Sequence, residues 1–381
     1  MRTWDIFCTV VDNYGDIGVC WRLARQLATE HGFQVRLWVD DLDRFHRICP
    51  GIVARRELQQ SHGVEVRWWR EPFSSVDVAD VVVEAFACNP PASYVAAMAA
   101  RQPKPAWINL EFLSAESWVQ GCHALPSPQP SLGLTKYFFF PGFVDGTGGL
   151  LAERGLMQAR DRFRQSAAEQ ARFWERLGLG APRAGEVQVS LFCYAHDGIS
   201  GLFRAWAGGG TPLRCLAPEG IATQALAAFF GTENLAAGSI QRKAGLEVGI
   251  FPFLDQDDYD RLLWVCDLNL VRGEDSFVRA QWAARPLIWQ IYPQQEQAHW
   301  PKLQAFLGLY CRALPVDVAA AVIRFGEAWN QGDGRQVEAA WPDFWKHRLA
   351  LQAHADHWAG QMANSGDLAN NLAQFCRNLL K

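Results

Sequence analysis

The 381-residue sequence has no large excess of charge of one sign. Its 36 Lys and Arg oppose 40 Asp and Glu, which leaves a net charge of −4. Proteins that bind a nucleic-acid backbone non-specifically usually carry a basic excess, so we expect no nucleic-acid partner. No apolar run approaches the length of a membrane helix, and Asp5 interrupts the apolar N-terminal segment. We therefore expect neither a membrane span nor a signal peptide.

Cysteine motifs are also missing. The ten cysteines are scattered, and no C-x-x-C or H-x-x-x-H pair occurs. This spacing gives no indication of a zinc site or a redox dithiol, and we expect no bound metal. In a chain of this length the pattern favours reduced, mostly buried thiols and a cytoplasmic location. G-x-S-x-G, Walker and zincin motifs are absent as well, so serine hydrolases, P-loop ATPases and zinc proteases have no support.

What the sequence does contain is enough apolar material for two cores. Apolar residues make up 49% of the chain, and charged residues make up 20%. At roughly 150 residues per domain, the length predicts two domains with connectors. The 17 Trp and 23 Phe exceed what core filling usually takes, so we expect some of them to line a cleft or a contact surface.

Strand and helix patterns alternate along the first half. Apolar strand patterns cover residues 4–11, 33–39, 64–68, 78–85, 105–110 and 138–140, and helix patterns cover 19–30 and 92–100. Residues 124–133 resemble an ordered Pro- and Ser-rich loop, and 154–177 a long charged helix. Such alternation is typical of a mostly parallel sheet covered by helices on both faces.

The alternation resumes in the second half after a Gly-rich break at residues 180–185. Strand patterns cover 187–192, 212–216, 246–251, 267–271 and 286–290, with helix patterns at 221–230, 257–265, 276–284 and 298–307, and a helical tail to Lys381. We predict an α/β protein with a first domain over 1–153, a connector helix over 154–184 and a second domain over 185–345.

The first polar constellation is Asp12-x-x-Gly15-Asp16-x-Gly18, between the first strand and the first helix. Ligands of open α/β sheets bind at the carboxyl ends of strands, and a helix N-terminus offers amides there. The spacing differs from the dinucleotide motif G-x-G-x-x-G. On the residues alone, two roles are open for the two aspartates. They either bind a ligand or, as is commoner for such residues, shape the turn and cap the helix.

The second constellation is residues 272–279, Arg-Gly-Glu-Asp-Ser-Phe-Val-Arg, after the 267–271 strand. A turn that opens a helix offers amides and a positive dipole end to a phosphate, and Ser276 adds a hydroxyl. The alternative is an Asp or Ser helix cap, and the two roles are compatible.

Two further segments are polar or aromatic where strands end. Residues 285–297 run from a short strand into a loop with Tyr292 and several Gln, which suit hydroxyl and phosphate groups. Residues 251–259 join Phe253 and Gln256, which suit a nucleobase, to acids of which Asp257 or Asp258 is expected to cap a helix. Ordinary strand, loop and core roles remain open for both segments. We find no partner for the isolated histidines His196 and His299.

The three sequence blocks at residues 11–23, 272–282 and 289–294 resemble the elongation factor P arginine rhamnosyltransferase family, EarP. The resemblance extends over essentially the whole chain. It implies a GT-B fold: two Rossmann-like domains that face a cleft, with the C-terminal helices, about 346–381, returning to the first domain. It also implies an inverting, metal-independent transfer of L-rhamnose from dTDP-β-L-rhamnose to an arginine of translation elongation factor P. No cofactor beyond this donor substrate is implied.

The resemblance also implies roles for individual residues. Asp16 resembles the general base, Asp12 its companion in the acceptor site, and Glu274 an acid of the second domain that activity requires. The other residues that the resemblance places at the substrates are Asn13, Tyr14, Gly15, Gly18, Phe192, Tyr194, Phe253, Gln256, Arg272, Gly273, Asp275, Ser276, Tyr292 and Gln294. Of these, Phe192, Phe253 and Gln256 fall at thymine and ribose, and Asp275, Ser276, Tyr292 and Gln294 near diphosphate and sugar.

Two other functions are weighed beside this one. The chain is alternatively a GT-B glycosyltransferase that uses another nucleotide sugar and a small-molecule acceptor, or a noncatalytic two-domain binding protein. Saturation-transfer NMR with several nucleotide sugars identifies the donor and so tests the first alternative. Mass spectrometry of elongation factor P after incubation with this protein tests the second.

Overall fold

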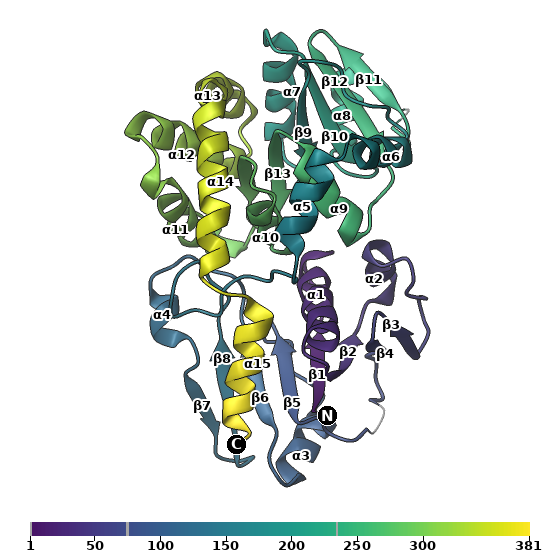
Figure 1. Cartoon of the computed structure of the whole chain (residues 1–381), viewed down its shortest axis with the longest axis vertical. Coiled ribbons are helices and arrows are strands. Elements are labelled where there is room, and N and C mark those ends of the chain that lie inside the picture. Colours follow the sequence, from purple (N-terminus) through teal and green to yellow (C-terminus); the bar gives the residue numbers. More distant parts are fainter. Residues whose placement is uncertain (1, 74–75, 234) are drawn as a thin grey trace. The chain divides into compact units, whose positions relative to one another are not determined.

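The computed structural model describes residues 2–73, 76–233 and 235–381. Contacts divide the chain into two compact units. The first unit consists of the chain up to Arg154 together with Met362–Lys381, and the second of Gly155–Gln361. Each unit contains one sheet with helices packed against it (Figure 1).

The sheet of the first unit has the strand order β3-β4-β2-β1-β5-β6-β8-β7. The inner strands are parallel, and the two edge strands β3 and β7 are antiparallel to their neighbours. The strands are β1 (Thr3–Cys8), β2 (Gln34–Val39), β3 (Leu58–Ser61), β4 (Val64–Trp68), β5 (Val81–Ala85), β6 (Ala106–Leu110), β7 (Pro126–Gln129) and β8 (Leu134–Phe139). The helices are α1 (Gly15–Thr29), α2 (Leu42–Ile48), α3 (Ala92–Ala100), α4 (Trp118–Cys122) and α15 (Leu368–Leu379).

The sheet of the second unit has the order β11-β12-β10-β9-β13-β14, with only β11 antiparallel to its neighbour. Its strands are β9 (Val187–Leu191), β10 (Leu213–Pro218), β11 (Ile240–Lys243), β12 (Leu246–Phe251), β13 (Leu268–Arg272) and β14 (Leu287–Gln290). Its helices include α5 (Leu156–Gln165), α6 (Ala167–Leu177), α7 (Gly198–Gly208), α8 (Thr223–Phe230), α9 (Gln256–Val265) and α10 (Asp275–Trp282). The chain continues through α11 (Trp300–Tyr310), α12 (Val316–Gln331), α13 (Gly334–Lys346) and α14 (Arg348–Asn364).

Buried aromatic side chains fill both cores. Six tryptophans are among the largest fully buried side chains, at positions 4, 21, 38, 206, 282 and 329. In the first unit Phe7 stacks on Trp38, with ring centroids 5.7 Å apart, and contacts the edge of Tyr94. These six tryptophans therefore serve packing, while the expectation that some aromatic residues line a binding surface stays a prediction for the others.

The predicted long helix over 154–177 is two helices, α5 and α6. Ser166 lies between them, and its hydroxyl accepts a hydrogen bond from the Glu169 amide. A serine followed three residues later by a glutamate is a helix-start pattern, which explains the break. Both helices belong to the second unit, so residues 155–184 form part of that unit and not a separate connector.

The helical tail divides within α14. Up to Gln361 the chain packs with the second unit, where Trp358 Nε1 donates to Gln281 Oε1 over 2.7 Å. The segment that returns to the first unit therefore begins at residue 362 and not near 346. Within the first unit, Phe375 of α15 lies against Tyr137 and Phe139 of β8.

Asp367 fixes the start of α15. Its carboxylate accepts from the Asn370 amide, from the Ala152 amide at 3.0 Å and from Gln26 Nε2 of α1 at 2.8 Å. One half-buried side chain therefore joins three separate segments of the first unit.

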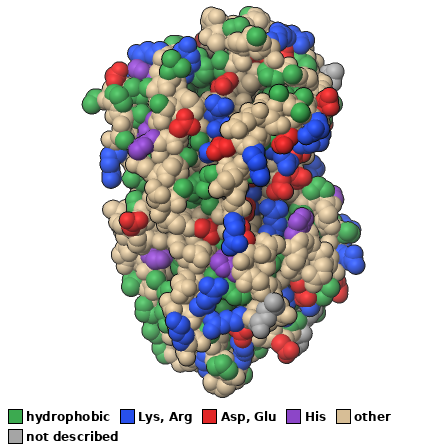
Figure 2. All heavy atoms as spheres, in the orientation of Figure 1, with side chains coloured by type: hydrophobic (Ala, Val, Ile, Leu, Met, Phe, Trp, Pro, Cys, Tyr) green, Lys and Arg blue, Asp and Glu red, His purple; other side chains and the backbone are tan. Residues whose placement is uncertain are grey.

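Charged side chains of both signs intermingle on the face drawn in Figure 2. None of the helices in the described residues is both long enough and apolar enough to span a membrane.

The predicted loop at 124–133 contains strand β7, which pairs with β8 from Pro126 to Gln129. Two prolines are tolerated there because β7 is an edge strand.

Candidate active site

The first group of candidate residues lies where β1 ends and α1 begins. Asp16 stands in the first turn of α1 and is only 3% exposed. Its Oδ2 atom accepts hydrogen bonds from the main-chain amides of Val11 and Asp12, each over 2.8 Å. Asp16 therefore ties the loop between β1 and α1 (residues 9–14, the β1–α1 loop) to the helix.

Burial raises the pKa of Asp16 above the ordinary value of an aspartate. The two amide hydrogen bonds act in the opposite direction, because they stabilise the charged form. The charges of Asp12 and Asp40 raise the pKa further, because like charges resist ionisation. The site is therefore a buried carboxylate with two more carboxylates nearby.

Glycine at position 15 leaves room for the Asp12 side chain. A Cβ atom on Gly15 would lie 2.7 Å from Asp12 Oδ2, so any other residue there would displace the Asp12 carboxylate. The Gly15 amide also donates to the Asp12 carbonyl at 2.7 Å, which closes the turn. Asn13 has φ = 36°, in the left-handed region that asparagine tolerates. Tyr14 precedes the helix, and its carbonyl accepts from the Gly18 amide at 2.9 Å.

The aspartates of the motif Asp12-x-x-Gly15-Asp16-x-Gly18 therefore do shape the turn, as one of the two alternatives predicted. The residue before α1 is Tyr14, whose side chain makes no capping bond, while Asp16 bonds back to the loop. Asp16 presents one oxygen to the protein in two hydrogen bonds. A carboxylate has a second oxygen, so shaping the turn and binding a ligand are compatible roles.

In the second unit, Arg272 is the central cation of the candidate residues. It ends β13, and its Nη1 donates to the Cys193 carbonyl over 2.8 Å. The guanidinium lies over the rings of Phe192 and Tyr194, 4.3 and 4.6 Å from their centroids. Both rings follow β9, the neighbour of β13 in the sheet. Adjacent parallel strands thus bring three predicted residues together.

Aromatic rings extend this group toward α9. The Phe192 centroid lies 6.3 Å from Phe253 and 5.7 Å from Tyr259. Gln256, the first residue of α9, donates through Nε2 to Asp275 Oδ2 at 3.2 Å. Asp255 caps α9 by accepting from the Asp258 amide, so the predicted cap at Asp257 or Asp258 is wrong by two or three residues.

The turn from β13 to α10 contains the remaining acidic candidates. Gly273 has φ = 60°, and Glu274 directly precedes α10 without a side-chain capping bond. The expected Asp or Ser cap is therefore wrong. Ser276 instead closes the turn: its hydroxyl donates to the Arg272 carbonyl at 2.5 Å and accepts from the Arg272 amide at 3.0 Å.

The loop after β14 brings the last predicted residues to the same region. Tyr292 is 40% exposed, and its ring lies 5.5 Å from Tyr194. The main-chain amide of Gln294 donates to His299 Nδ1 at 3.1 Å, a partner for His299 that the sequence did not reveal. His196 lies edge-on to the ring of Trp329, with centroids 4.3 Å apart. Burial lowers the pKa of His196 to about 4, so this ring is neutral at pH 7.

Comparison with known proteins places the whole chain in one family. The sequence profile of the family described as "Elongation-Factor P (EF-P) rhamnosyltransferase EarP" matches residues 4–377.

The chain belongs to the EarP family.

Relatives of this EarP-family chain extend over its full length. It is 50% identical to a protein-arginine rhamnosyltransferase of Pseudomonas putida over 378 residues, which cover 99% of each chain. It is 35% identical to one of Neisseria meningitidis, over 97% of this chain and 96% of the relative. A solved structure described as the basis for EarP-mediated arginine glycosylation of elongation factor EF-P superimposes with a TM-score of 0.71 at 35% identity, over 99% of both chains.

The predicted GT-B fold is confirmed for this EarP-family member. A calicheamicin glycosyltransferase shares the fold at 13% identity with a TM-score of 0.51 over the full length. At that level of identity the resemblance concerns the architecture only.

Two residues of the site were missed by the sequence analysis of this EarP-family chain. Gln290 is 4% exposed, and its Oε1 accepts from the Tyr194 amide at 2.7 Å, so it holds the loop that carries Tyr194. Asp40 accepts from the Val10 amide at 2.9 Å beside the β1–α1 loop. Both directly end or follow strands next to the strands already considered, and that position was the available signal.

Proposed function

We propose that this protein transfers L-rhamnose from dTDP-β-L-rhamnose to an arginine side chain of translation elongation factor P, with inversion at the anomeric carbon. The observation that carries the proposal is the 50% identity to a protein-arginine rhamnosyltransferase over 99% of both chains. The paired carboxylates of the first unit and the aromatic and cationic cluster of the second support it, because they suit a guanidinium and a nucleotide respectively.

The acceptor arginine binds at Asp12 and Asp16 in this proposal. A guanidinium presents five donors in a planar fork, which matches carboxylates through charge-assisted hydrogen bonds. The Asp16 oxygen that the loop amides leave available accepts from the guanidinium, and Asp12 accepts from a second nitrogen. Together they aim one nitrogen at the anomeric carbon, which lowers the entropic part of the barrier.

Proton removal from the guanidinium cannot precede bond formation. An arginine pKa exceeds about 12, while that of a free aspartic acid is about 3.9, so full transfer beforehand would cost roughly 11 kcal/mol. The proton therefore leaves as the C–N bond forms and the bond from C1 to the diphosphate oxygen breaks. Burial is the main cause of the raised pKa of Asp16. It reduces the difference between the pKa values of Asp16 and the arginine, so Asp16 is suited to receive that proton.

The donor binds at the second unit in this proposal. Phe192 and Phe253 stack on or flank the thymine, and Gln256 binds the ribose. The diphosphate lies against the Arg272 guanidinium and the first amides of α10, where the helix dipole is positive. Tyr292 and Gln294 contact diphosphate and sugar. Ser276 contributes by holding the β13–α10 turn, since its hydroxyl donates to the Arg272 carbonyl.

Charge on the departing dTDP is neutralised without a metal in this proposal. The leaving diphosphate gains negative charge in the transition state, and preorganised donors stabilise it at little reorganisation cost. Arg272 supplies a fixed cation, because the Cys193 carbonyl and two aromatic rings hold its guanidinium. Glu274 is proposed as an acid that activity requires, at the start of α10.

Intact-mass spectrometry of elongation factor P tests the proposal. After incubation with this protein and dTDP-β-L-rhamnose, elongation factor P should gain the mass of one deoxyhexose residue, located by peptide fragmentation on an arginine. NMR of the glycopeptide should show an α-linked rhamnose if the β-linked donor reacts with inversion. Reactions with dTDP-glucose, and with an acceptor whose modified arginine is replaced by lysine, serve as controls. An unmodified acceptor in the presence of properly folded protein refutes the proposal.

A further inference from the structure

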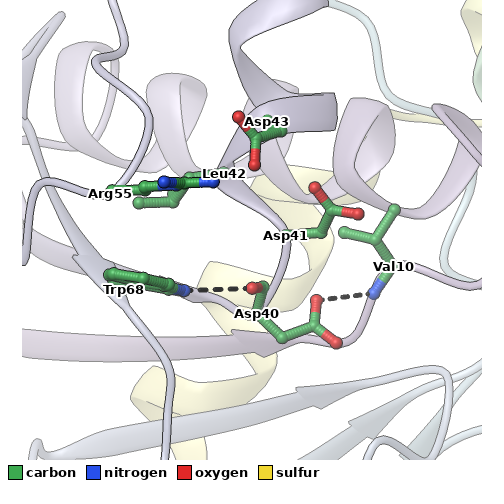
Figure 3. Close-up of a pocket in the computed structure, with 7 residues that line it drawn as sticks. All are labelled: Val10, Asp40, Asp41, Leu42, Asp43, Arg55 and Trp68. Atoms are coloured by element: carbon green, nitrogen blue, oxygen red, sulfur yellow. Dashed lines mark hydrogen bonds between the residues drawn. The ribbon is translucent and has the colours of Figure 1, made fainter.

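Three successive main-chain amides of the β1–α1 loop donate to carboxylates. The Val11 and Asp12 amides donate to Asp16, and the Val10 amide donates to Oδ1 of Asp40 over 2.9 Å (Figure 3). Asp40 comes from another part of the chain, directly after β2. The loop that carries Asp12 is therefore held from two sides, by α1 and by the end of β2.

The main chain of Asp40 is itself fixed by the sheet. The last residue of β2, Val39, pairs with Cys8, the last residue of β1. The indole Nε1 of Trp68 donates to the Asp40 carbonyl over 3.1 Å, as Figure 3 also shows. Asp40 thus stands at a defined place, from which its side chain reaches the amide two residues beyond β1.

At Val11 the loop is exposed and is held by its main chain. The Val11 side chain is 66% exposed, so packing of this residue does not hold its main chain. Asn13 is in the left-handed region, and a non-glycine residue there needs surrounding contacts to persist. Arg44 Nη1 donates to the Val10 carbonyl over 3.3 Å, a longer contact on the other side of the same residue. Val10 itself is buried, so packing also holds this end of the loop, and hydrogen bonds to the carboxylates of Asp16 and Asp40 fix the main-chain amides of residues 10–12.

We infer that Asp40 is a positioning residue for the acceptor carboxylates: by accepting the Val10 amide, it holds the β1–α1 loop in the geometry that Asp12 and Asp16 need to orient the guanidinium. The inference rests on the proposed function. Asp40 acts through the loop and not by contact with the reacting atoms, and its essential property is an oxygen that accepts a hydrogen bond.

A second property of Asp40 must be separated from the first. Its negative charge is one of the influences that raise the pKa of Asp16, after burial and the charge of Asp12. Asp40→Asn removes the charge but keeps an oxygen for the Val10 amide, whereas Asp40→Ala removes both. Asp43 provides a matched control, because it lines the same pocket of about 680 Å³ as an exposed carboxylate on α2.

The experiment measures rhamnosylation of elongation factor P by the full-length Asp40→Ala, Asp40→Asn and Asp43→Ala variants. Asp40→Ala should lose about 10- to 100-fold in kcat/KM for the acceptor, the range expected for a lost hydrogen bond to a charged group that misplaces reacting groups. Its affinity for dTDP should equal that of the unaltered protein. Asp40→Asn should recover activity to within about 3-fold, since its side-chain oxygen makes the same hydrogen bond. Asp43→Ala should match the unaltered protein.

Hydrogen–deuterium exchange gives a readout that does not depend on activity. The peptide that contains residues 10–12 should exchange faster in Asp40→Ala than in Asp40→Asn or Asp43→Ala, because the Val10 amide loses its acceptor. Unaltered exchange and activity in Asp40→Ala overturn the inference, as does an equal loss in Asp40→Ala and Asp40→Asn, which would assign the effect to charge. Absence of transfer by the unaltered protein would instead overturn the proposed function.

Discussion

Replacing Asp16 by asparagine should abolish transfer and at the same time stabilise the first unit. Both hydrogen bonds from the loop fall on Oδ2, and the single side-chain oxygen of asparagine has two lone pairs with which to accept them. The loop geometry is thus retained. What the variant loses is the negative charge that, in the proposed function, holds the guanidinium and receives its proton. Loss of a general base typically costs about 10²–10⁴-fold in rate.

The sign of the stability change follows from the raised pKa of Asp16. Burial makes the folded protein bind this proton more tightly than the unfolded chain, so ionisation of Asp16 destabilises the folded state. That destabilisation is fully present above the folded-state pKa and disappears as the pH falls through it to the ordinary value of 3.8. Asparagine cannot ionise, so the variant should be the more stable protein at neutral pH, with a difference that shrinks toward acid.

The size of the effect scales with the elevation of the pKa. Each pH unit of elevation is worth about 1.4 kcal/mol, and each kcal/mol moves the melting temperature of a domain of this size by about 2–4 °C. Differential scanning fluorimetry at pH 7.5 and at several lower pH values measures the difference. Calorimetry with dTDP provides the control, since the donor affinity of the variant should be unchanged. A variant that is less stable at pH 7.5, or one that transfers rhamnose at the unaltered rate, would refute the reasoning.

Three further predictions concern other parts of the site. Phe253→Ala should weaken dTDP binding by about 1–3 kcal/mol, the range for lost base stacking. Calorimetry measures this, and unchanged affinity with an intact circular dichroism spectrum would return Phe253 to a packing role. Gly15→Ala should lower acceptor kcat/KM while dTDP affinity stays constant, because its Cβ would lie 2.7 Å from Asp12 Oδ2; equal acceptor kinetics would show that the loop accommodates the methyl group. Transfer should persist after exhaustive EDTA treatment without stimulation by Mg²⁺ or Mn²⁺ if Arg272 and α10 neutralise the diphosphate as proposed. A rate that EDTA abolishes and one divalent ion restores would contradict that view.

The sequence allowed the sheets to be predicted better than the details at their edges. Inner strands such as β5 and β12 are apolar apart from one glutamate each, so their positions are visible from the local sequence. The edge strands β3, β7 and β11 are short and half exposed, and β7 even contains prolines. Their strand conformation depends on a neighbour in the sheet, and a local pattern does not reveal that neighbour.

Site residues divide in a similar way. Asp12, Asp16 and the residues around Arg272 occur in compact motifs between a strand and a helix, where the chain order itself marks the sheet edge. Asp40 and Gln290 were missed because their importance comes from partners 30 and 96 residues away in the sequence. Likewise, Ser276 has a hydroxyl that could bind a phosphate, and only the structure reveals that this hydroxyl donates to the main-chain carbonyl of Arg272.

The return of α15 to the first unit affects how this protein can be made. Asp367 on this last segment binds Gln26 and Ala152, and Leu368, Leu372 and Cys376 are buried. A ribosome therefore finishes the second unit before it has synthesised the residues that complete the first. During synthesis, the first unit therefore keeps an uncovered apolar surface, open to chaperones and proteases, until α15 has left the ribosome. The first unit should consequently complete its fold only after the second unit has been made.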